Sequence, residues 1–363
     1  MNETWWVNPD QLDDDQKKAI ELPIDKSYLI IGPPGSGKTN LLLLHAEYLV
    51  RSGKPNVLIL SFTRTLKEFI VSGGRQYAFS SLKVKTCIMW EIDLLKEYGI
   101  TPEECSDFTT LRRNLVCQVQ ELISNENLAN IYDAILLDES QDWLPEEIKI
   151  FKQLGKVIFA VADSNQKIYD EEGAIDLLRN MVDEEVKLRY HYRNGRKICC
   201  VSEEVLRKND DYKFLSPTCN YNETANPSSA QIVRCDNIAD LCGKIIVNLS
   251  VQVRAFPDEL LGVLCLKNED LELIWAYIES SELASLAIRQ ASNTGYVNFT
   301  SDKRICVSTI HSAKGLEFRT VHIANCDNLS KFGPQQKRVI FTAMTRAKTA
   351  LQLYYLTNVP EVV

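Results

Sequence analysis

The sequence predicts an α/β protein of two domains, each with a parallel β-sheet that is covered by helices. Short apolar and β-branched runs alternate with helical patterns along the chain, which is typical of parallel strands joined by crossover helices. The polar stretch Asp183–Asn194 separates a first series of these runs from a second. We therefore expect an N-terminal domain over residues 1–185 and a C-terminal domain over residues 186–363, both of ordinary size.

The predicted strands are short apolar runs that polar or turn residues separate. In the N-terminal half they are Tyr28–Ile31, Val57–Ser61, Ala134–Leu137 and Val157–Val161. In the C-terminal half they are Gln231–Cys235, Leu261–Leu266, Arg304–Thr309 and Val321–Ala324. Helical periodicity lies between them at Leu41–Val50, Glu146–Leu154, Ile238–Leu249 and Leu271–Ile278.

The composition excludes several classes of protein. Hydrophobic residues make up 45% of the chain and charged residues 25%, a balance that excludes a disordered, collagenous or coiled-coil chain. The net charge of -8 means that a nucleic-acid partner would need a local basic path. No apolar run approaches the roughly 20 residues that cross a bilayer, and the start lacks the pattern of a signal peptide. We expect a cytoplasmic protein with no membrane partner.

The spacing of the cysteines matches neither a disulfide framework nor a metal site. There are 11 of them, an odd number, scattered without a CxxC pair. With only four histidines, no zinc-ligand spacing emerges either. The expectation is a set of reduced, mostly buried thiols.

A phosphate-binding loop follows the first predicted strand. The sequence GPPGSGKT matches GxxxxGK[ST] and stands between a strand and an apolar helix. Its glycines let backbone N–H groups cradle phosphates, while Lys38 supplies a positive charge and Thr39 a hydroxyl for Mg²⁺. The predicted nucleotide-binding residues of the loop are Gly32, Pro33, Pro34, Gly35, Ser36, Gly37, Lys38 and Thr39. The alternative, a simple glycine turn before a helix, leaves the complete pattern unexplained.

An acidic segment, DESQD, follows the third predicted strand. Carboxyl ends of parallel strands face the crevice where a phosphate loop lies. We therefore expect Asp138 to hold Mg²⁺ and Glu139 to orient and deprotonate the attacking water. Taken alone, the same residues would also fit a solvated acidic loop.

An ordered set of segments between Leu12 and Lys348 resembles the motifs of superfamily-one helicases of the UvrD/Rep type. Besides the phosphate loop, the segments are Leu12–Gln16, Ser61–Thr65, Asp138–Asp142, Val161–Tyr169, Tyr192–Arg193, Ser308–Phe318 and Thr345–Ala347. The resemblance implies two RecA-like P-loop NTPase domains with the ATP site at their interface. It also implies ATP and Mg²⁺ as cofactors.

The resemblance assigns further residues to the nucleotide and to nucleic acid. It places Gln16 and Tyr192 on the adenine base and Gln166 on the γ-phosphate, whose charge the arginines Arg193 and Arg346 would stabilise. Further nucleotide contacts fall to Gly315 and Glu317, and the predicted contacts to single-stranded DNA are Phe62, Thr63, Arg64, Thr309 and His311. RNA remains open as an alternative partner.

The chain also departs from the family pattern. The long accessory insertions of the family are missing: residues 91–130 leave room for a small helical insertion, and residues 278–304 for little more than a turn. After the third motif, acidic residues stand where the family has a DNA-stacking tryptophan, and Tyr169 fits either a partial substitute or a core residue.

The leading interpretation is an ATP-dependent DNA helicase or translocase core that moves 3′-to-5′ on single-stranded DNA. One alternative is a nucleic-acid-dependent ATPase subunit that does not unwind alone but powers or regulates a partner, such as a nuclease in phage defence or repair. Another is a nucleotide-regulated binding module without catalysis. A small-molecule P-loop kinase leaves the motifs of the second domain unexplained.

Overall fold

The computed structural model describes residues 12–61, 83–103, 105, 107–163, 174–206, 214–290, 302–313, 316–327 and 329–360. The chain divides into two compact units that part between Leu188 and Arg189, and the loop residues Pro33–Ser36 are grouped with the second unit. Among the described helices, none is long and apolar enough to span a bilayer.

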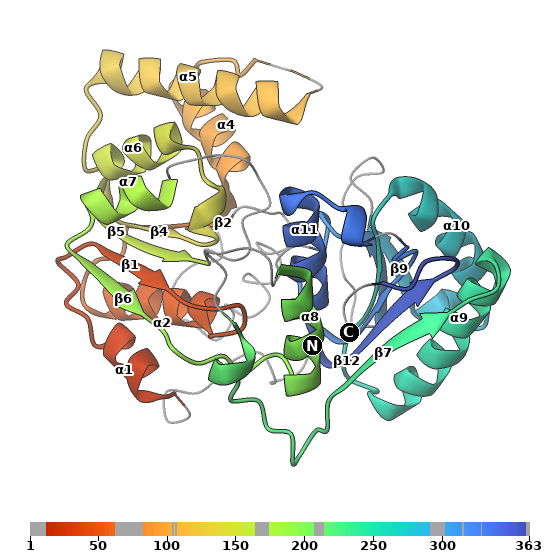
Figure 1. Ribbon diagram of the computed structural model, residues 1–363. Helices are drawn as coiled ribbons and strands as arrows, with labels where there is room; N and C mark the ends of the chain where they lie inside the picture. The colour runs from red at the N-terminus through yellow and green to blue at the C-terminus, as the bar shows by residue number, and fades with distance from the viewer. Residues whose placement is uncertain are drawn as a thin grey trace. The chain divides into compact units, whose positions relative to one another are not determined.

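The first unit is built on a six-stranded sheet in the order β3-β2-β4-β5-β1-β6 (Figure 1). All of its described pairings are parallel. The strands are β1 (Tyr28–Ile31), β2 (Val57–Ser61), β3 (Val84–Thr86), β4 (Tyr132–Leu137), β5 (Gly155–Ala162) and β6 (Glu184–Lys187). Since crossovers separate these strands, the topology is that of a helix-covered α/β sheet.

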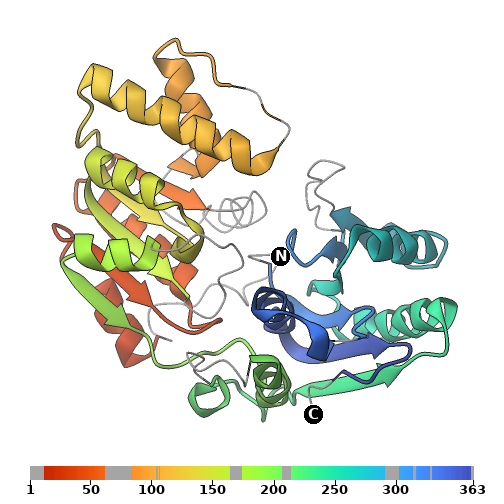
Figure 2. The ribbon, with the colours of Figure 1, turned by 45° about the horizontal axis from the view of Figure 1, so that its top comes forward.

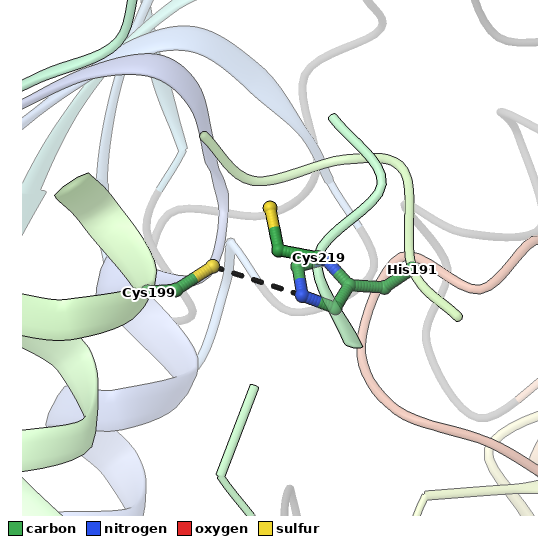
Figure 3. Close-up of side chains that lie close together, drawn as sticks. All are labelled: His191, Cys199 and Cys219. Carbon is green, nitrogen blue, oxygen red and sulfur yellow. Dashed lines mark hydrogen bonds between the residues drawn. The ribbon is translucent and has the colours of Figure 1, made fainter. Parts of the chain in front are cut away.

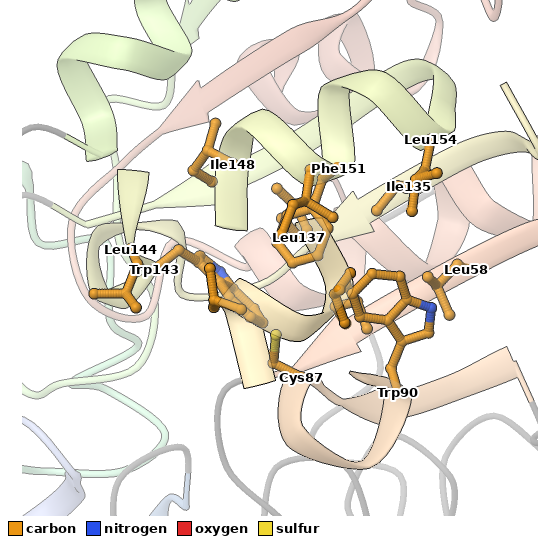
Figure 4. Packing of buried hydrophobic residues seen from close by; sticks show 14 of the residues in the cluster. Leu58, Cys87, Trp90, Ile135, Leu137, Trp143, Leu144, Ile148, Phe151 and Leu154 are labelled. Carbon is orange, nitrogen blue, oxygen red and sulfur yellow. The ribbon is translucent and has the colours of Figure 1, made fainter. Parts of the chain in front are cut away.

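Helices cover both faces of this sheet because successive strand residues point to opposite sides. Tyr28 and Ile30 of β1 pack on the face of α1 (Asp14–Ile20) and α2 (Lys38–Arg51), whereas Leu29 packs on the other face. The helices of the second face are α4 (Cys87–Glu97), α5 (Phe108–Glu126), α6 (Pro145–Leu154) and α7 (Ala174–Met181). Figure 4 shows part of this second core. Strands buried on both faces explain the continuous apolar runs in the sequence.

The helices α4 and α5 form a pair outside α6, where residues 91–130 were expected to hold a small helical insertion (Figures 1 and 2). Asp107 caps α5 by accepting a hydrogen bond from the backbone N–H of Thr110 at 2.8 Å. The guanidinium of Arg112 on α5 donates to the carboxylate of Glu147 on α6, with Nε 2.6 Å from Oε1. This buried ion pair ties the added helix to the sheet-covering layer.

The second unit contains another six-stranded sheet, in the order β7-β12-β11-β8-β10-β9, and its described pairings are again parallel. The strands are β7 (Ser229–Arg234), β8 (Leu261–Cys265), β9 (Ala287–Gln290), β10 (Ile305–Thr309), β11 (Phe318–Ile323) and β12 (Ala347–Tyr355). One face carries α8 (Arg196–Leu206) and α11 (Pro334–Met344), the other α9 (Ile238–Ala255) and α10 (Asn268–Glu279). Short 3₁₀ turns occur at η4 (Ser140–Asp142), η6 (Ser216–Thr218), η7 (Ala284–Leu286) and η8 (Leu329–Lys331).

The two parallel sheets confirm the predicted fold class of two RecA-like α/β units. Every strand that the sequence predicts is present, within a few residues at its ends. Four strands escaped prediction: β3, β6, β9 and β12. β3 and β9 are very short, β6 is a polar edge strand within the stretch read as a domain boundary, and β12 follows directly on the last motif.

Candidate active site

Three segments with polar side chains follow three neighbouring strands of the first sheet. The phosphate loop follows β1, Asp138 follows β4 and Asp163 follows β5, and these strands are adjacent in the order β4-β5-β1. Carboxyl ends of parallel strands meet at one edge of a sheet, so the three segments converge. The predicted nucleotide site of the first unit lies at this edge.

The conformation of the phosphate loop depends on its glycines. Gly35 and Gly37 have φ angles of 74° and 83°, in the left-handed region that favours glycine. A Cβ atom at Gly37 would lie 2.8 Å from Nε2 of Gln16, so the loop passes directly against that side chain. Gln16 is held there by a capping box at the start of α1, in which its Oε1 accepts a hydrogen bond from the N–H of Asp13 at 3.0 Å.

Lys38 is positioned at the start of α2. Its ammonium donates to the carbonyl oxygen of Gly32 at 2.8 Å, and its Nζ lies 3.9 Å from Oδ2 of Asp163. Both contacts hold the positive charge beside the loop, where phosphate oxygens would need it.

Thr39 and Asp138 form an oxygen-rich pair. The hydroxyl of Thr39 donates to the carboxylate of Asp138 at 3.1 and 3.4 Å. Burial, and then the nearby charge of Glu139, raise the pKa of Asp138 to about 7. A bound cation would offset that cost, and a hydroxyl with a carboxylate is the hard-oxygen donor set that Mg²⁺ prefers. These residues therefore fit the expected metal.

Glu139 has an unusual backbone conformation, with φ 49° and ψ 47°. Its Oε2 accepts a hydrogen bond from the side-chain amide of Gln141 at 2.6 Å, and Oε1 of Gln141 accepts from the backbone N–H of Asp163 at 2.9 Å. The indole N–H of Trp143 donates to the backbone carbonyl of Asp138 at 2.9 Å. The two acidic residues are thus fixed from both sides, as a positioned metal ligand and base require.

The second unit brings together residues from two of the predicted motifs and the residue that follows a third. Arg193 forms an ion pair with Glu317, and Nζ of Lys348 lies 3.8 Å from the same carboxylate. Burial lowers the pKa of Lys348. Glu317, which was expected to contact nucleotide, therefore serves here as the anion between two cations.

Asn194 joins the fourth motif to the sixth. Its buried side-chain amide donates to the carbonyl oxygens of Thr345 and Ala347 at 2.8 and 2.6 Å. These residues flank Arg346, which is only 2% exposed. One amide therefore fixes the backbone on both sides of a predicted catalytic arginine.

Three other predicted residues lie in the second unit, and their predicted roles stay predictions. Tyr192 is half-buried, Thr309 ends β10 and its hydroxyl caps a turn at Ser312, and His311 is exposed. The predicted residues Phe62, Thr63, Arg64, Gln166 and Gly315 lie outside the described part of the chain. Their contacts stay predictions.

Sequence reasoning missed several residues that hold the site. These are Gln141, Trp143 and Asp163 in the first unit and Asn194 and Lys348 in the second. Each stands inside or directly beside a motif, which is the signal that could have found them. Their hydrogen bonds bridge distant segments, so the sequence alone does not give their partners.

Two protein families match parts of the chain. Residues 16–172 match the AAA domain family, and residues 304–354 match the UvrD-like helicase C-terminal domain. Among curated proteins, none matches.

Two solved structures are similar at 16% identity. The C-terminal domain of a possible DNA helicase from Lactobacillus plantarum WCFS1 aligns with 47% of this chain and 92% of its own, with a TM-score of 0.34. The arterivirus nonstructural protein 10 (helicase) aligns with 94% of this chain, with a TM-score of 0.43. This chain spans 61% of that viral protein.

Proposed function

We propose that the chain is an ATP-hydrolysing helicase of the UvrD/Rep type that couples hydrolysis of Mg-ATP to 3′-to-5′ movement on single-stranded DNA. The domain matches support a nucleic-acid helicase core. The single-stranded substrate, the direction of movement and the metal belong to the proposal.

One observation supports the proposal: the first unit brings the groups expected to bind phosphate and metal and to activate water to one sheet edge. Lys38 lies beside the phosphate loop, Thr39 contacts Asp138, and Glu139 is fixed by Gln141. A phosphate loop with a purely structural role would not need Glu139, with its left-handed backbone and hydrogen-bonded carboxylate, beside the buried carboxylate of Asp138.

Each residue has a definite task in this proposal. Thr39 and Asp138 would hold Mg²⁺, which when bound neutralises charge on the β- and γ-phosphates. Lys38 binds the same phosphates, and Glu139 orients the attacking water and accepts its proton. Arg193 and Arg346 stabilise the charge that develops on the γ-phosphate.

The proposed nucleic-acid contacts are Phe62, Thr63, Arg64, Thr309 and His311. The net charge of -8 favours binding along a restricted basic path rather than over the whole surface. Binding to single-stranded DNA should therefore weaken steeply as salt rises.

Steady-state ATP turnover with and without single-stranded DNA tests the proposal. We expect stimulation at low salt, and Lys38→Ala or Glu139→Gln should lower turnover by about 10²–10⁴-fold. Lys26→Ala and Glu146→Gln, at exposed positions of the same unit, are the matched controls and should turn over ATP normally. ATP turnover that single-stranded DNA leaves unchanged would contradict the proposal. Unwinding of duplexes with 3′ or 5′ single-stranded tails reports the direction of movement.

A second candidate function is an ATPase subunit that does not unwind DNA alone but powers or regulates a partner such as a nuclease. Two observations favour it. The helical addition of the first unit consists of α4 and α5, and the described residues between α10 and β10 form only η7 and β9. A fluorescent duplex with a 3′ single-stranded tail separates the candidates, because robust unwinding by the purified chain alone rejects the subunit.

A further inference from the structure

A histidine and two cysteines from three separate segments converge in the second unit. His191 precedes the Tyr192–Arg193 pair, Cys199 lies in the first turn of α8, and Cys219 follows η6. Their ligand atoms all lie within 4.8 Å of one another. Figure 3 shows the side chain of Cys199 pointing at the His191 ring, with Cys219 beside it.

The backbone holds two of these residues together independently of their side chains. His191 and Cys219 are paired in a parallel β-bridge, in which the N–H of His191 donates to the carbonyl of Thr218 at 3.1 Å and its carbonyl accepts from Asn220 at 2.8 Å. His191 and Cys199 are fully buried, whereas Cys219 is partly exposed. Backbone hydrogen bonds therefore fix two of the three residues, and Cys219 gives the cluster a side that solvent can reach.

The spacing of the donor atoms matches a tetrahedral metal site. Zinc bonds of about 2.0–2.3 Å in a tetrahedron place neighbouring donors about 3.3–3.8 Å apart. Sγ of Cys199 lies 3.7 Å from Nε2 of His191. The backbone carbonyl oxygen of Asn194 lies 3.3 Å from Sγ of Cys219 and 3.7 Å from Sγ of Cys199.

A second cluster of possible metal ligands, in the first unit, differs from the one in the second unit. Cys87, Glu91 and Glu147 also lie close together, but Arg112 already provides a cation to Glu147. The three residues of the second unit are one imidazole and two thiols, which is the soft donor set that selects zinc.

We propose that His191, Cys199 and Cys219 bind a zinc ion, with the Asn194 carbonyl oxygen or a water in the fourth position. Binding releases the two thiol protons to solvent. Nε2–H of His191 donates to the backbone carbonyl of Leu215, 3.0 Å away, and this proton moves to Nδ1 when Nε2 binds the ion. The ion is structural: it fixes the segment that carries Arg193 and the amide of Asn194.

Metal binding to the full chain tests the proposal directly, without reference to ATP hydrolysis. The reduced, metal-free protein is titrated with Zn²⁺ against a chromophoric chelator, and with Co²⁺ as a spectroscopic substitute. We expect one equivalent to bind, with a thiolate-to-cobalt charge-transfer band. Cys219→Ser, at the partly exposed ligand, should weaken binding by at least on the order of 100-fold.

The matched control is Cys200→Ser, because Cys200 is the exposed neighbour of Cys199 on α8. It should bind Zn²⁺ and Co²⁺ like the unaltered chain, and circular dichroism verifies that both variants are folded. The proposal is overturned if the reduced, folded chain binds no equivalent of metal, or if Cys200→Ser and Cys219→Ser weaken binding equally. It is also overturned if mass spectrometry of protein kept from added oxidant finds Cys199 and Cys219 joined in a disulfide.

Discussion

The side-chain amide of Gln141 lies 2.6 Å from Oε2 of Glu139, and this contact links the proposed base to the end of the neighbouring strand. The oxygen of the same amide accepts a hydrogen bond from the backbone of Asp163, which follows β5 and lies near Lys38. One buried side chain therefore connects the residues expected to act on water and on phosphate.

Replacing Gln141 with methionine tests this connection. Gln141→Met keeps the volume of the side chain but removes both hydrogen bonds, so Glu139 is free to turn away from the attacking water. We expect kcat for ATP to fall by about 10–100-fold with a small change in KM, because misplacement of a catalytic group affects the transition state more than binding. Steady-state kinetics measures both values. A normal kcat would show that Glu139 is positioned by other contacts.

Asn194 should matter for stability as well as for the placement of Arg346. Asn194→Ala leaves the carbonyls of Thr345 and Ala347 without their buried donor. We expect the free energy of unfolding to fall by about 2–4 kcal/mol, since each unsatisfied buried group costs about 1–3 kcal/mol. Urea denaturation followed by circular dichroism measures the change. The exposed Asn268→Ala is the control, and equal effects of the two variants would contradict this reading.

The ion pair between Arg112 and Glu147 predicts a large effect from a single substitution. Arg112→Met leaves a buried carboxylate without its cation and should cost about 3–5 kcal/mol of unfolding free energy. Lys156→Met breaks an exposed pair with Asp133 and should cost at most about 1 kcal/mol. Thermal or urea unfolding compares the two.

A second substitution separates lost charge pairing from lost packing. Adding Glu147→Gln to Arg112→Met removes the unpaired charge while keeping an acceptor for the N–H of Leu144, 2.7 Å from the carboxylate. We expect part of the stability to return. No recovery would mean that packing of the arginine stem accounts for the loss.

Glu91 makes the folding stability of the first unit depend on pH. Burial, and then the charge of Glu147, raise the pKa of Glu91 to about 8 from an ordinary value near 4.5. The folded state therefore keeps a proton that the unfolded state loses, so stability falls as pH rises from about 4.5 to about 8. Glu91→Gln should be about 2–4 kcal/mol more stable than the unaltered chain at pH 8 and similar to it at pH 4.5.

Urea denaturation at a series of pH values measures this difference. Glu121→Gln on the exposed side of α5 is the control and should leave the pH dependence unchanged. Parallel stability curves for Glu91→Gln and the unaltered chain would exclude Glu91 as the source.

The sequence predicted those parts of the fold that local patterns determine. Fully buried apolar strands such as Val57–Ser61 are visible because both of their faces are buried, and the phosphate loop is visible because its chemistry needs a fixed order of residues. By contrast, β6 is polar and lies at a sheet edge, where burial imposes no pattern.

The unpredicted part of the site has a similar physical cause. The proposed metal ligand Asp138 and the proposed base Glu139 stand in one short segment, whereas the residues that hold them act across the fold. The pairing of Lys38 with Asp163, or of Asn194 with Thr345, depends on strand order and on loop docking. The gathering of His191 with Cys199 and Cys219 is likewise invisible in their spacing.

The position of β4 in the middle of the first sheet affects how the carboxylates can move. β4 pairs with β2 and β5, and the amide of Asp138 extends the ladder by donating to the carbonyl of Leu60 at 3.0 Å. Opening that amide to solvent requires separation of buried central strands. Deuterium should therefore enter the amide of Asp138 only on the slow timescale of global unfolding, which would place the proposed catalytic carboxylates in the most persistent part of the unit.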